Sequence, residues 1–216
     1  MPITEPLPPP ALFEARGLSF ARGEEPIFGP LDLALDSGAT LVIEGGNGAG
    51  KTTLIRVLAG VLEPSAGELL WQGRSITTDP RPAGAIAVLG HALGLKLELS
   101  ARENLAYRLA LHGLKPGLTI ETALKSVALE GYEDIAVRSL SAGQRKRVAL
   151  AGLLLTSSTL WLLDEPYANL DRPGQVLVNR MLETHCLRGG AALLTSHGLI
   201  QPEVSNYRTM TLRAPA

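Results

Sequence analysis

The sequence predicts an α/β fold built on a mostly parallel sheet, and three features predict it. Short apolar segments at 40–44, 85–89, 160–163 and 191–195 have the composition of strands buried on both faces. Segments with helical patterning alternate with these strands, as the connections between parallel strands require. The chain has 216 residues, which is enough for one domain with a substantial core.

The N-terminal half supplies most of the strands. A helix is expected from about 50 to 59, directly after a glycine-rich segment. Strand-like segments lie at 12–20, 31–36, 40–44, 67–72 and 85–89. The glycine-rich segment between a buried strand and a helix is therefore the first feature that points to chemistry.

A helical block then interrupts the alternation, between about 91 and 150. Helices are expected at 100–112, at 119–130 and from Ser141 onward. Ser100, with Glu103 three residues later, forms a capping-box pattern at the start of the first of them. We therefore expect an inserted helical subdomain.

The C-terminal part returns to strands. Asp171 is the expected cap of the helix between the last two buried strands, and Pro173 suits its first turn. A last strand is expected at 208–212. Residues 11–216 are therefore predicted to form one domain.

Composition and charge narrow the class of function. The net charge is −1, from 20 basic and 21 acidic side chains, which gives no reason to expect nucleic acid as a partner. No apolar run approaches the roughly 20 residues of a spanning helix, so the cytoplasm is the expected location. Residues 1–10 are rich in proline, lack signal-peptide features and are expected to be disordered. Cys186, the single cysteine, is expected to be a small buried hydrophobe.

One segment matches the phosphate-loop pattern G-x-x-x-x-G-K-[ST]. Backbone N–H groups can surround phosphates only where the backbone comes close, so glycine is favoured, and the following helix adds its positive end. Lys51 is expected at the β- and γ-phosphates of ATP, and the Thr52 hydroxyl is expected to bind Mg²⁺. The predicted nucleotide-binding residues are Gly45, Gly46, Asn47, Gly48, Ala49, Gly50, Lys51, Thr52 and Thr53.

A pair of carboxylates, Asp164 and Glu165, follows the apolar strand at 160–163. If this strand and the strand before the phosphate loop lie in one parallel sheet, the carboxylates come beside that loop. Asp164 would then hold Mg²⁺ through its water shell, and Glu165 would polarise the attacking water as general base. A strand that ends in a solvated acidic turn is the alternative.

Three further segments resemble motifs of the ABC ATPase family. They are Leu140-Ser141-Ala142-Gly143-Gln144, similar to the signature motif, Ala168-Asn169-Leu170-Asp171, similar to the D-loop, and Thr195-Ser196-His197, similar to the switch histidine. With the phosphate loop and the acidic strand, they follow the family's order from about residue 12 to the end of the chain.

This resemblance implies a P-loop ABC ATPase domain with an N-terminal antiparallel β part and an inserted helical subdomain. It also implies that the signature motif docks on the γ-phosphate held by a second copy, so that a homodimer closes around ATP. Ser141 and Gly143 begin a helix, which suits an anion site. Asp171 would belong to the D-loop, and His197 would contact the γ-phosphate and orient the water. The implied signature residues are Ser141, Ala142, Gly143 and Gln144.

Three positions depart from the family pattern. Ala142 stands where glycine is commoner. His91 replaces the usual Q-loop glutamine and is either a ligand of water or phosphate or a structural hinge. Arg22 occupies the place of an aromatic ring that usually stacks on adenine, and its planar guanidinium can stack there instead.

The resemblance extends to one branch of the family, the ATP-binding subunits of bacterial cytochrome c maturation systems. The strings that carry it lie at 67–73, 89–91, 94–96, 99, 103–105, 131–135 and 160–161. It implies ATP hydrolysis linked to haem delivery or to release of a haem-loaded chaperone. The implied partners are CcmB-, CcmC- and CcmD-like membrane subunits, at the cytoplasmic face of the bacterial inner membrane.

Other interpretations stay open at this point. The same ATPase could serve an exporter of another cargo, or the chain could be a soluble ABC protein outside transport. A binding module without hydrolysis is opposed by Lys51, Asp164, Glu165 and His197, whereas His91 and Arg22 keep it open. The loop at 91–96 is the expected contact with a membrane subunit, with an ordinary surface loop as the alternative. The basic cluster at 145–147 is expected to be mainly a solvated helix face.

Overall fold

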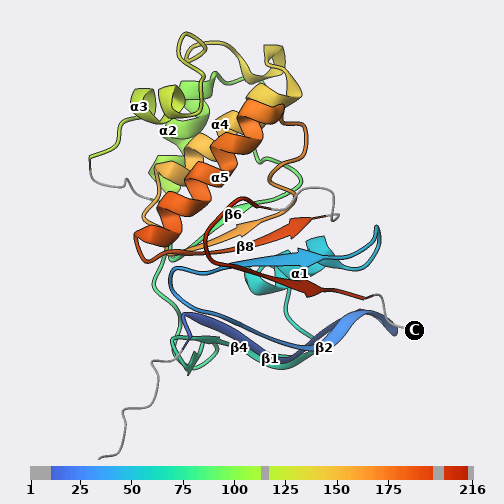
Figure 1. The fold of residues 1–216 in the computed structure, drawn as a ribbon. Helices are drawn as coiled ribbons and strands as arrows, with labels where there is room; N and C mark the ends of the chain where they lie inside the picture. The colour runs from blue at the N-terminus through green and yellow to red at the C-terminus, as the bar shows by residue number, and fades with distance from the viewer. Residues whose placement is uncertain (1–10, 113–116, 197–201, 214–216) are drawn as a thin grey trace, which may run out of the picture.

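The computed structural model describes residues 11–112, 117–196 and 202–213 (Figure 1). The disorder expected for residues 1–10 and the position of His197 lie outside the described residues. The strands are β1 (Phe13–Arg22), β2 (Glu25–Leu35), β3 (Thr40–Glu44), β4 (Ala66–Trp71), β5 (Arg74–Ser75), β6 (Ile86–Leu89), β7 (Leu160–Leu163), β8 (Ala191–Ser196) and β9 (Tyr207–Thr211). The helices are α1 (Lys51–Leu58), α2 (Ala101–His112), α3 (Ile120–Ser126), α4 (Ala142–Leu154) and α5 (Arg172–Leu187), with a 3-10 turn at Val137–Ser139.

The strands form two sheets, which confirms the predicted fold class. The larger sheet has the order β6-β7-β8-β3-β9, and each neighbouring pair in it is parallel. The smaller sheet has the order β2-β1-β4-β5 and is antiparallel throughout. It is the N-terminal antiparallel β part that the sequence led us to expect.

Helices cover both faces of the parallel sheet. Helix α1 lies between the two sheets, whereas α4 and α5 lie on the opposite face of the parallel sheet (Figure 1). Strand β7 shows how both faces are buried, because Leu160 and Leu162 join the core on the α1 side while Trp161 and Leu163 join the other core. Such a strand reads as a continuous apolar run, which is why the sequence identified it.

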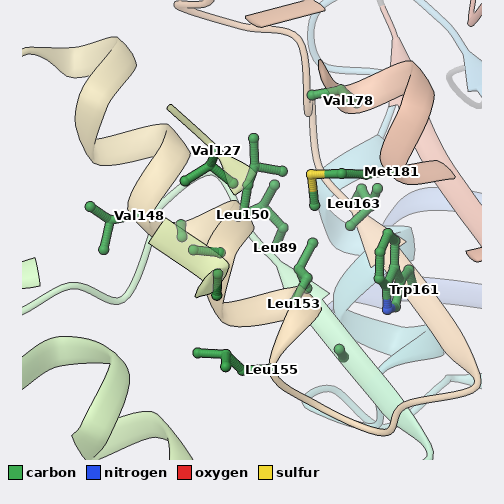
Figure 2. Close-up of a cluster of buried hydrophobic side chains, with 14 of the residues drawn as sticks. Leu89, Val127, Val148, Leu150, Leu153, Leu155, Trp161, Leu163, Val178 and Met181 are labelled. Carbon is green, nitrogen blue, oxygen red and sulfur yellow. The ribbon is translucent and has the colours of Figure 1, made fainter. Parts of the chain in front are cut away.

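The C-terminal half of α4 is the centre of the second core (Figure 2). Val148, Leu150 and Leu153 are fully buried there. They pack among side chains of β6, β7 and α5, which include Leu89, Trp161, Leu163, Val178 and Met181. The start of α4 is thereby held at a fixed place next to the end of β7.

Two predicted elements differ from the structure by more than two residues at one end. Strand β2 begins at Glu25 rather than at 31, and it includes the pair Gly29-Pro30. A proline is tolerated there since β2 is an edge strand, where a missing N–H breaks no ladder bond. Helix α3 ends at Ser126 rather than at 130, because Ala128 is left-handed, with φ of +57°.

Helices α2, α3 and α4 lie in the segment 91–150 for which the sequence predicts a helical subdomain. The capping box of α2 is present, since the Ser100 N–H donates to Glu103 Oε2 and the Glu103 N–H to Ser100 Oγ. Cys186 is only half-buried, and its Sγ lies 3.4 Å from Thr40 Oγ1, so it was wrong to expect a buried side chain there. In the part of the chain that the structure describes, no helix is long and apolar enough to cross a bilayer.

Candidate functional site

The predicted phosphate loop connects β3 to α1 at the carboxyl end of the parallel sheet. Gly50 is the N-cap of α1 and is left-handed, with φ of +89°. A side chain on Gly50 would be strained by this conformation and would lie 3.0 Å from Ile27 Cγ2. Gly48 is also left-handed, with φ of +81°. The loop therefore turns its backbone toward the N-terminus of α1, the geometry of an anion site.

Lys51 is the first residue of α1 and is nearly buried, with 6% of its surface exposed. Its ammonium donates to the carbonyl oxygens of Gly45, at 2.5 Å, and Gly46, at 3.0 Å. A strongly hydrated cation is thus held within the loop by backbone carbonyls. A polyanion in the loop would meet this charge directly.

The predicted acidic residues come beside the phosphate loop, as the sequence led us to expect. Asp164 follows β7 and has 1% of its surface exposed. Its Oδ2 accepts a hydrogen bond of 2.8 Å from Thr52 Oγ1, and its Oδ1 one of 2.7 Å from Thr195 Oγ1. The solvated acidic turn is therefore excluded.

Thr195 is a functional candidate that sequence reasoning gave no role of its own. It lies near the end of β8, the strand between β7 and β3, and so stands between Asp164 and the loop. Besides donating to Asp164, its hydroxyl accepts the N–H of Glu165 at 2.9 Å. The strand order of a sheet decides this position, and no short motif encodes it.

The oxygen atoms at this point suit a magnesium ion bound together with phosphates. Thr52 Oγ1 and Asp164 Oδ2 are hard oxygen donors 2.8 Å apart. Among the described residues, no group of three or more His, Cys, Asp or Glu side chains could hold a metal by itself. Mg²⁺ usually takes one or two protein ligands and completes its shell with water and substrate phosphates. The residues present fit that pattern.

The segment 141–144 caps helix α4 in the way the sequence suggested. Ser141 is the N-cap, and Gln144 returns its side chain to the Ser141 N–H at 2.9 Å, while Ser141 Oγ accepts the Gln144 N–H. Ser141 and Ala142 are exposed. The start of α4 therefore lies at the surface.

The basic cluster at 145–147 is not a solvated face, and that expectation was wrong. Lys146 has 5% of its surface exposed, and its ammonium donates to the Glu165 carbonyl oxygen at 2.9 Å. Burial lowers the pKa of Lys146 to about 8, an effect that the nearby Asp164 and Glu165 carboxylates only partly offset. Arg147 donates to Val127 O at 3.1 Å and Asp171 Oδ1 at 2.8 Å. The helix turns this face toward the segment after β7, which residue type alone does not reveal.

Asp171 caps α5, as predicted. Its Oδ1 accepts the Gly174 N–H at 3.0 Å in addition to the Arg147 guanidinium. These donors stabilise the carboxylate and hold the pKa of Asp171 below its usual value. The carboxylate thus joins the start of α5 to α4.

Comparison with known proteins identifies the family. The family model for ABC transporters matches residues 28–168. The chain is 52% identical over 207 residues to the cytochrome c biogenesis ATP-binding export protein CcmA of Xanthomonas campestris, covering 96% of both chains. It is 42% identical to the CcmA protein of Pseudomonas putida, over 92% of this chain and 95% of that one.

The chain belongs to the CcmA family of ABC transporter ATP-binding proteins. Two solved structures have a fold similar to that of this chain. An ABC transporter ATP-binding protein from Pyrococcus furiosus has a TM-score of 0.79 at 25% identity, over 94% of this chain and 99% of that one. An ATP-binding subunit of another ABC transporter has a TM-score of 0.78 at 24% identity, over 88% of this chain and 80% of that one. ABC transporter ATP-binding proteins bind and hydrolyse ATP, so this CcmA-family chain is an ATPase.

A groove of about 720 Å³ is lined by Thr52 of the predicted phosphate loop and by residues of α2. Asp164 and the exposed His91 also line it. Residues 141–144 are not among the described residues that line it. Arg22 lies outside the groove as well, exposed at the end of β1.

Arg108 of α2 lines this groove, and the hydrogen bonds of its guanidinium are incomplete among the described residues. Its side chain packs on Gly152 of α4, where a Cβ atom would lie 3.0 Å from Arg108 Cδ. Its Nε is buried and has no hydrogen-bond partner among the described residues, and burial lowers its pKa. One terminal nitrogen reaches the Val88 carbonyl only at 3.5 Å.

Proposed function

We propose that this chain is the ATP-hydrolysing subunit of a bacterial cytochrome c maturation exporter. Its turnover would drive haem delivery or release of a haem-loaded chaperone. The connected set Thr52, Asp164, Thr195 and Glu165 carries the ATPase part, because it joins the phosphate loop to a carboxylate pair. The sequence identity to CcmA proteins supports the proposed cargo.

In this proposal the phosphate loop holds ATP through Lys51 and the N–H groups of residues 45–53. Thr52 and Asp164 would bind Mg²⁺, which supplies positive charge at the β- and γ-phosphates. Glu165 follows Asp164 directly in the chain and acts as general base on the attacking water. His197 is proposed to contact the γ-phosphate, although its position lies outside the described residues.

We assign residues 11–216 to one nucleotide-binding domain with a helical subdomain at about 91–150. Two such domains are proposed to close on ATP, with residues 141–144 of one copy meeting the γ-phosphate of the other. The exposure of Ser141 and Ala142 at a helix N-terminus supports this arrangement. Asp171 would lie in the D-loop at the same interface, and Arg22 would stack on adenine.

The groove is the proposed contact with a CcmB-like membrane subunit, which would place the chain at the cytoplasmic face of the inner membrane. Val61, Tyr107 and Leu111 line it with 70%, 50% and 64% of their surfaces exposed. Such a run of exposed apolar side chains is typical of an interaction site. Arg108 adds a half-buried positive charge. The proposed occupant is therefore a helical segment of the membrane subunit that carries a carboxylate.

Purification of the tagged chain from detergent-solubilised native membranes, followed by mass spectrometry, tests the proposed partners. Recovery of CcmB- and CcmC-like subunits supports the cytochrome c maturation complex, and ATP-dependent release of the haem-loaded chaperone from that complex supports its task. Recovery of an unrelated membrane protein would contradict the cargo but leave the ATPase site intact. Recovery of no membrane subunit would favour a soluble ABC protein.

A further inference from the structure

One face of α4 runs along the segment that follows β7. Gly143, Lys146 and Arg147 share this face, because residues three and four apart lie on the same side of a helix. A Cβ atom on Gly143 would lie 3.0 Å from the Asn169 carbonyl oxygen. Lys146 reaches the carbonyl of Glu165, and Arg147 reaches the carboxylate of Asp171. The start of α4 therefore contacts residues 165–171 at three successive points.

Glu165 has an uncommon backbone conformation at one of these points. Its φ is +49°, in the left-handed region that a residue with a side chain rarely adopts, because it does so only at a cost in free energy. Two neighbours hold this residue by its main chain. The Glu165 N–H donates to Thr195 Oγ1 of β8, and its carbonyl accepts from Lys146 of α4.

A lysine in this place is not explained by packing. Only 5% of its surface is exposed, and burying an ammonium carries a free-energy cost that an apolar side chain of similar length avoids. The ammonium nitrogen lies 2.9 Å from the Glu165 carbonyl oxygen. A hydrogen bond from a charged donor is stronger than a neutral one, so it can hold a strained peptide in place.

We propose that Lys146 is a positioning residue for ATP hydrolysis, which holds the main chain of Glu165 left-handed and so directs its carboxylate toward the attacking water. This inference rests on the proposed role of Glu165 as general base. Lys146 does not touch the reacting atoms. Its contribution is to fix the direction in which the side chain of Glu165 leaves the end of β7.

The test is the substitution Lys146→Met, which keeps an unbranched side chain up to the ε position and removes the ammonium donor. Measured on the full chain in its membrane complex, kcat should fall about 10- to 100-fold, the loss expected when a catalytic group is displaced by about 1 Å. The KM for ATP and the ATP affinity should change by less than about threefold, because Lys51 and the phosphate loop are untouched. Lys146→Arg, which retains a charged donor, should recover part of the rate.

Arg145→Met is the matched control, since Arg145 precedes Lys146 on the same helix and is also a cation. It should leave kcat within about twofold, because no contact to Glu165 is lost. An equal loss in Arg145→Met would overturn the proposal in favour of a general charge effect on α4. Wild-type kcat in Lys146→Met would overturn it as well.

Folding and the role of Glu165 are separated by two further measurements. If Lys146→Met and Lys146→Gln both fail to fold or to bind ATP, Lys146 is a structural residue and the proposal is wrong.

In a Glu165→Gln background, Lys146→Met should cause no additional loss of turnover, because the carboxylate that it positions is already absent. If Glu165→Gln alone hydrolyses ATP at a near-normal rate, the assignment of the base fails first. A dead Glu165→Gln with an active Lys146→Met would reject only the positioning role.

Discussion

Two lysines of this chain are equally buried but differ in how far their partners lie along the sequence. Lys51 and Lys146 have 6% and 5% of their surfaces exposed, and both donate to backbone carbonyl oxygens. The partners of Lys51 are five and six residues away in its own loop. The partner of Lys146 is 19 residues away, beyond a strand. A local motif can encode the first contact, whereas only the packed fold creates the second.

Substitutions of the two lysines should therefore have different effects on ATP binding and turnover. Lys51→Ala should have the largest effect of any substitution considered. Removing the ammonium takes away a charge-assisted contact to the phosphates, so ATP affinity should fall on the order of 100-fold and turnover should disappear. Equilibrium binding of a fluorescent ATP analogue measures this loss. Tight binding by Lys51→Ala would contradict the phosphate-loop assignment.

Glu165→Gln should reproduce the proposed behaviour of Lys146→Met in a more severe form. The amide cannot accept a proton, so kcat should fall about 10²- to 10⁴-fold while ATP binding stays near the wild-type level. The variant should also accumulate as an ATP-bound dimer. Single-turnover hydrolysis and size-exclusion chromatography with ATP measure both effects. An Asp164→Asn control should instead weaken Mg²⁺-dependent binding.

The same contrast between local and distant contacts explains what the sequence could predict. Strands buried on both faces, the phosphate loop and the capping box of α2 were predicted, because each depends on residues close together in the chain. The capping box of α4 was not predicted, although the start of that helix at Ser141 was. The junction of Thr52 with Asp164 was also predicted, since parallel strands of one sheet end at the same edge.

Contacts that depend on strand order or helix rotation were missed. Thr195 bridges Asp164 and Glu165 only because β8 lies beside β7. The sequence predicts a solvent-exposed Lys146, because a cation near the start of a helix usually is exposed and nothing in the neighbouring sequence indicates how α4 is rotated. The predicted β2 is too short because the pair Gly29-Pro30 within it is more typical of turns than of strands.

Arg108 extends the comparison to a cation whose contacts within the chain are incomplete. Its buried Nε has no partner among the described residues, so the missing partner is expected on the membrane subunit. Arg108→Gln should lower affinity for that subunit about 10- to 100-fold, since a buried charge pair loses one member. The ATPase rate of the isolated chain should be unchanged. Reconstitution with the solubilised membrane subunit, followed by a binding titration, measures the effect.

Arg102→Gln is the control for Arg108, because Arg102 lies on the same helix. Its guanidinium already forms ion pairs with Asp134 and Glu121. Both pairs are largely exposed and screened by solvent, so losing them should change stability only slightly and should leave complex formation intact. If Arg102→Gln weakens the complex as much as Arg108→Gln does, the groove is not the docking site.

The smallest expected effects come from substitutions in the capping boxes of α2 and α4. Ser100 with Glu103 begins α2, and Ser141 with Gln144 begins α4. Replacing either serine by alanine removes one cap acceptor and should lower the free energy of unfolding by about 1 kcal/mol, measurable by urea titration. Only Ser141→Ala should also lower ATPase activity, because its hydroxyl is proposed to meet the nucleotide of a second copy. Equal activity in both variants would reduce Ser141 to a helix cap and remove the main support for the closed dimer.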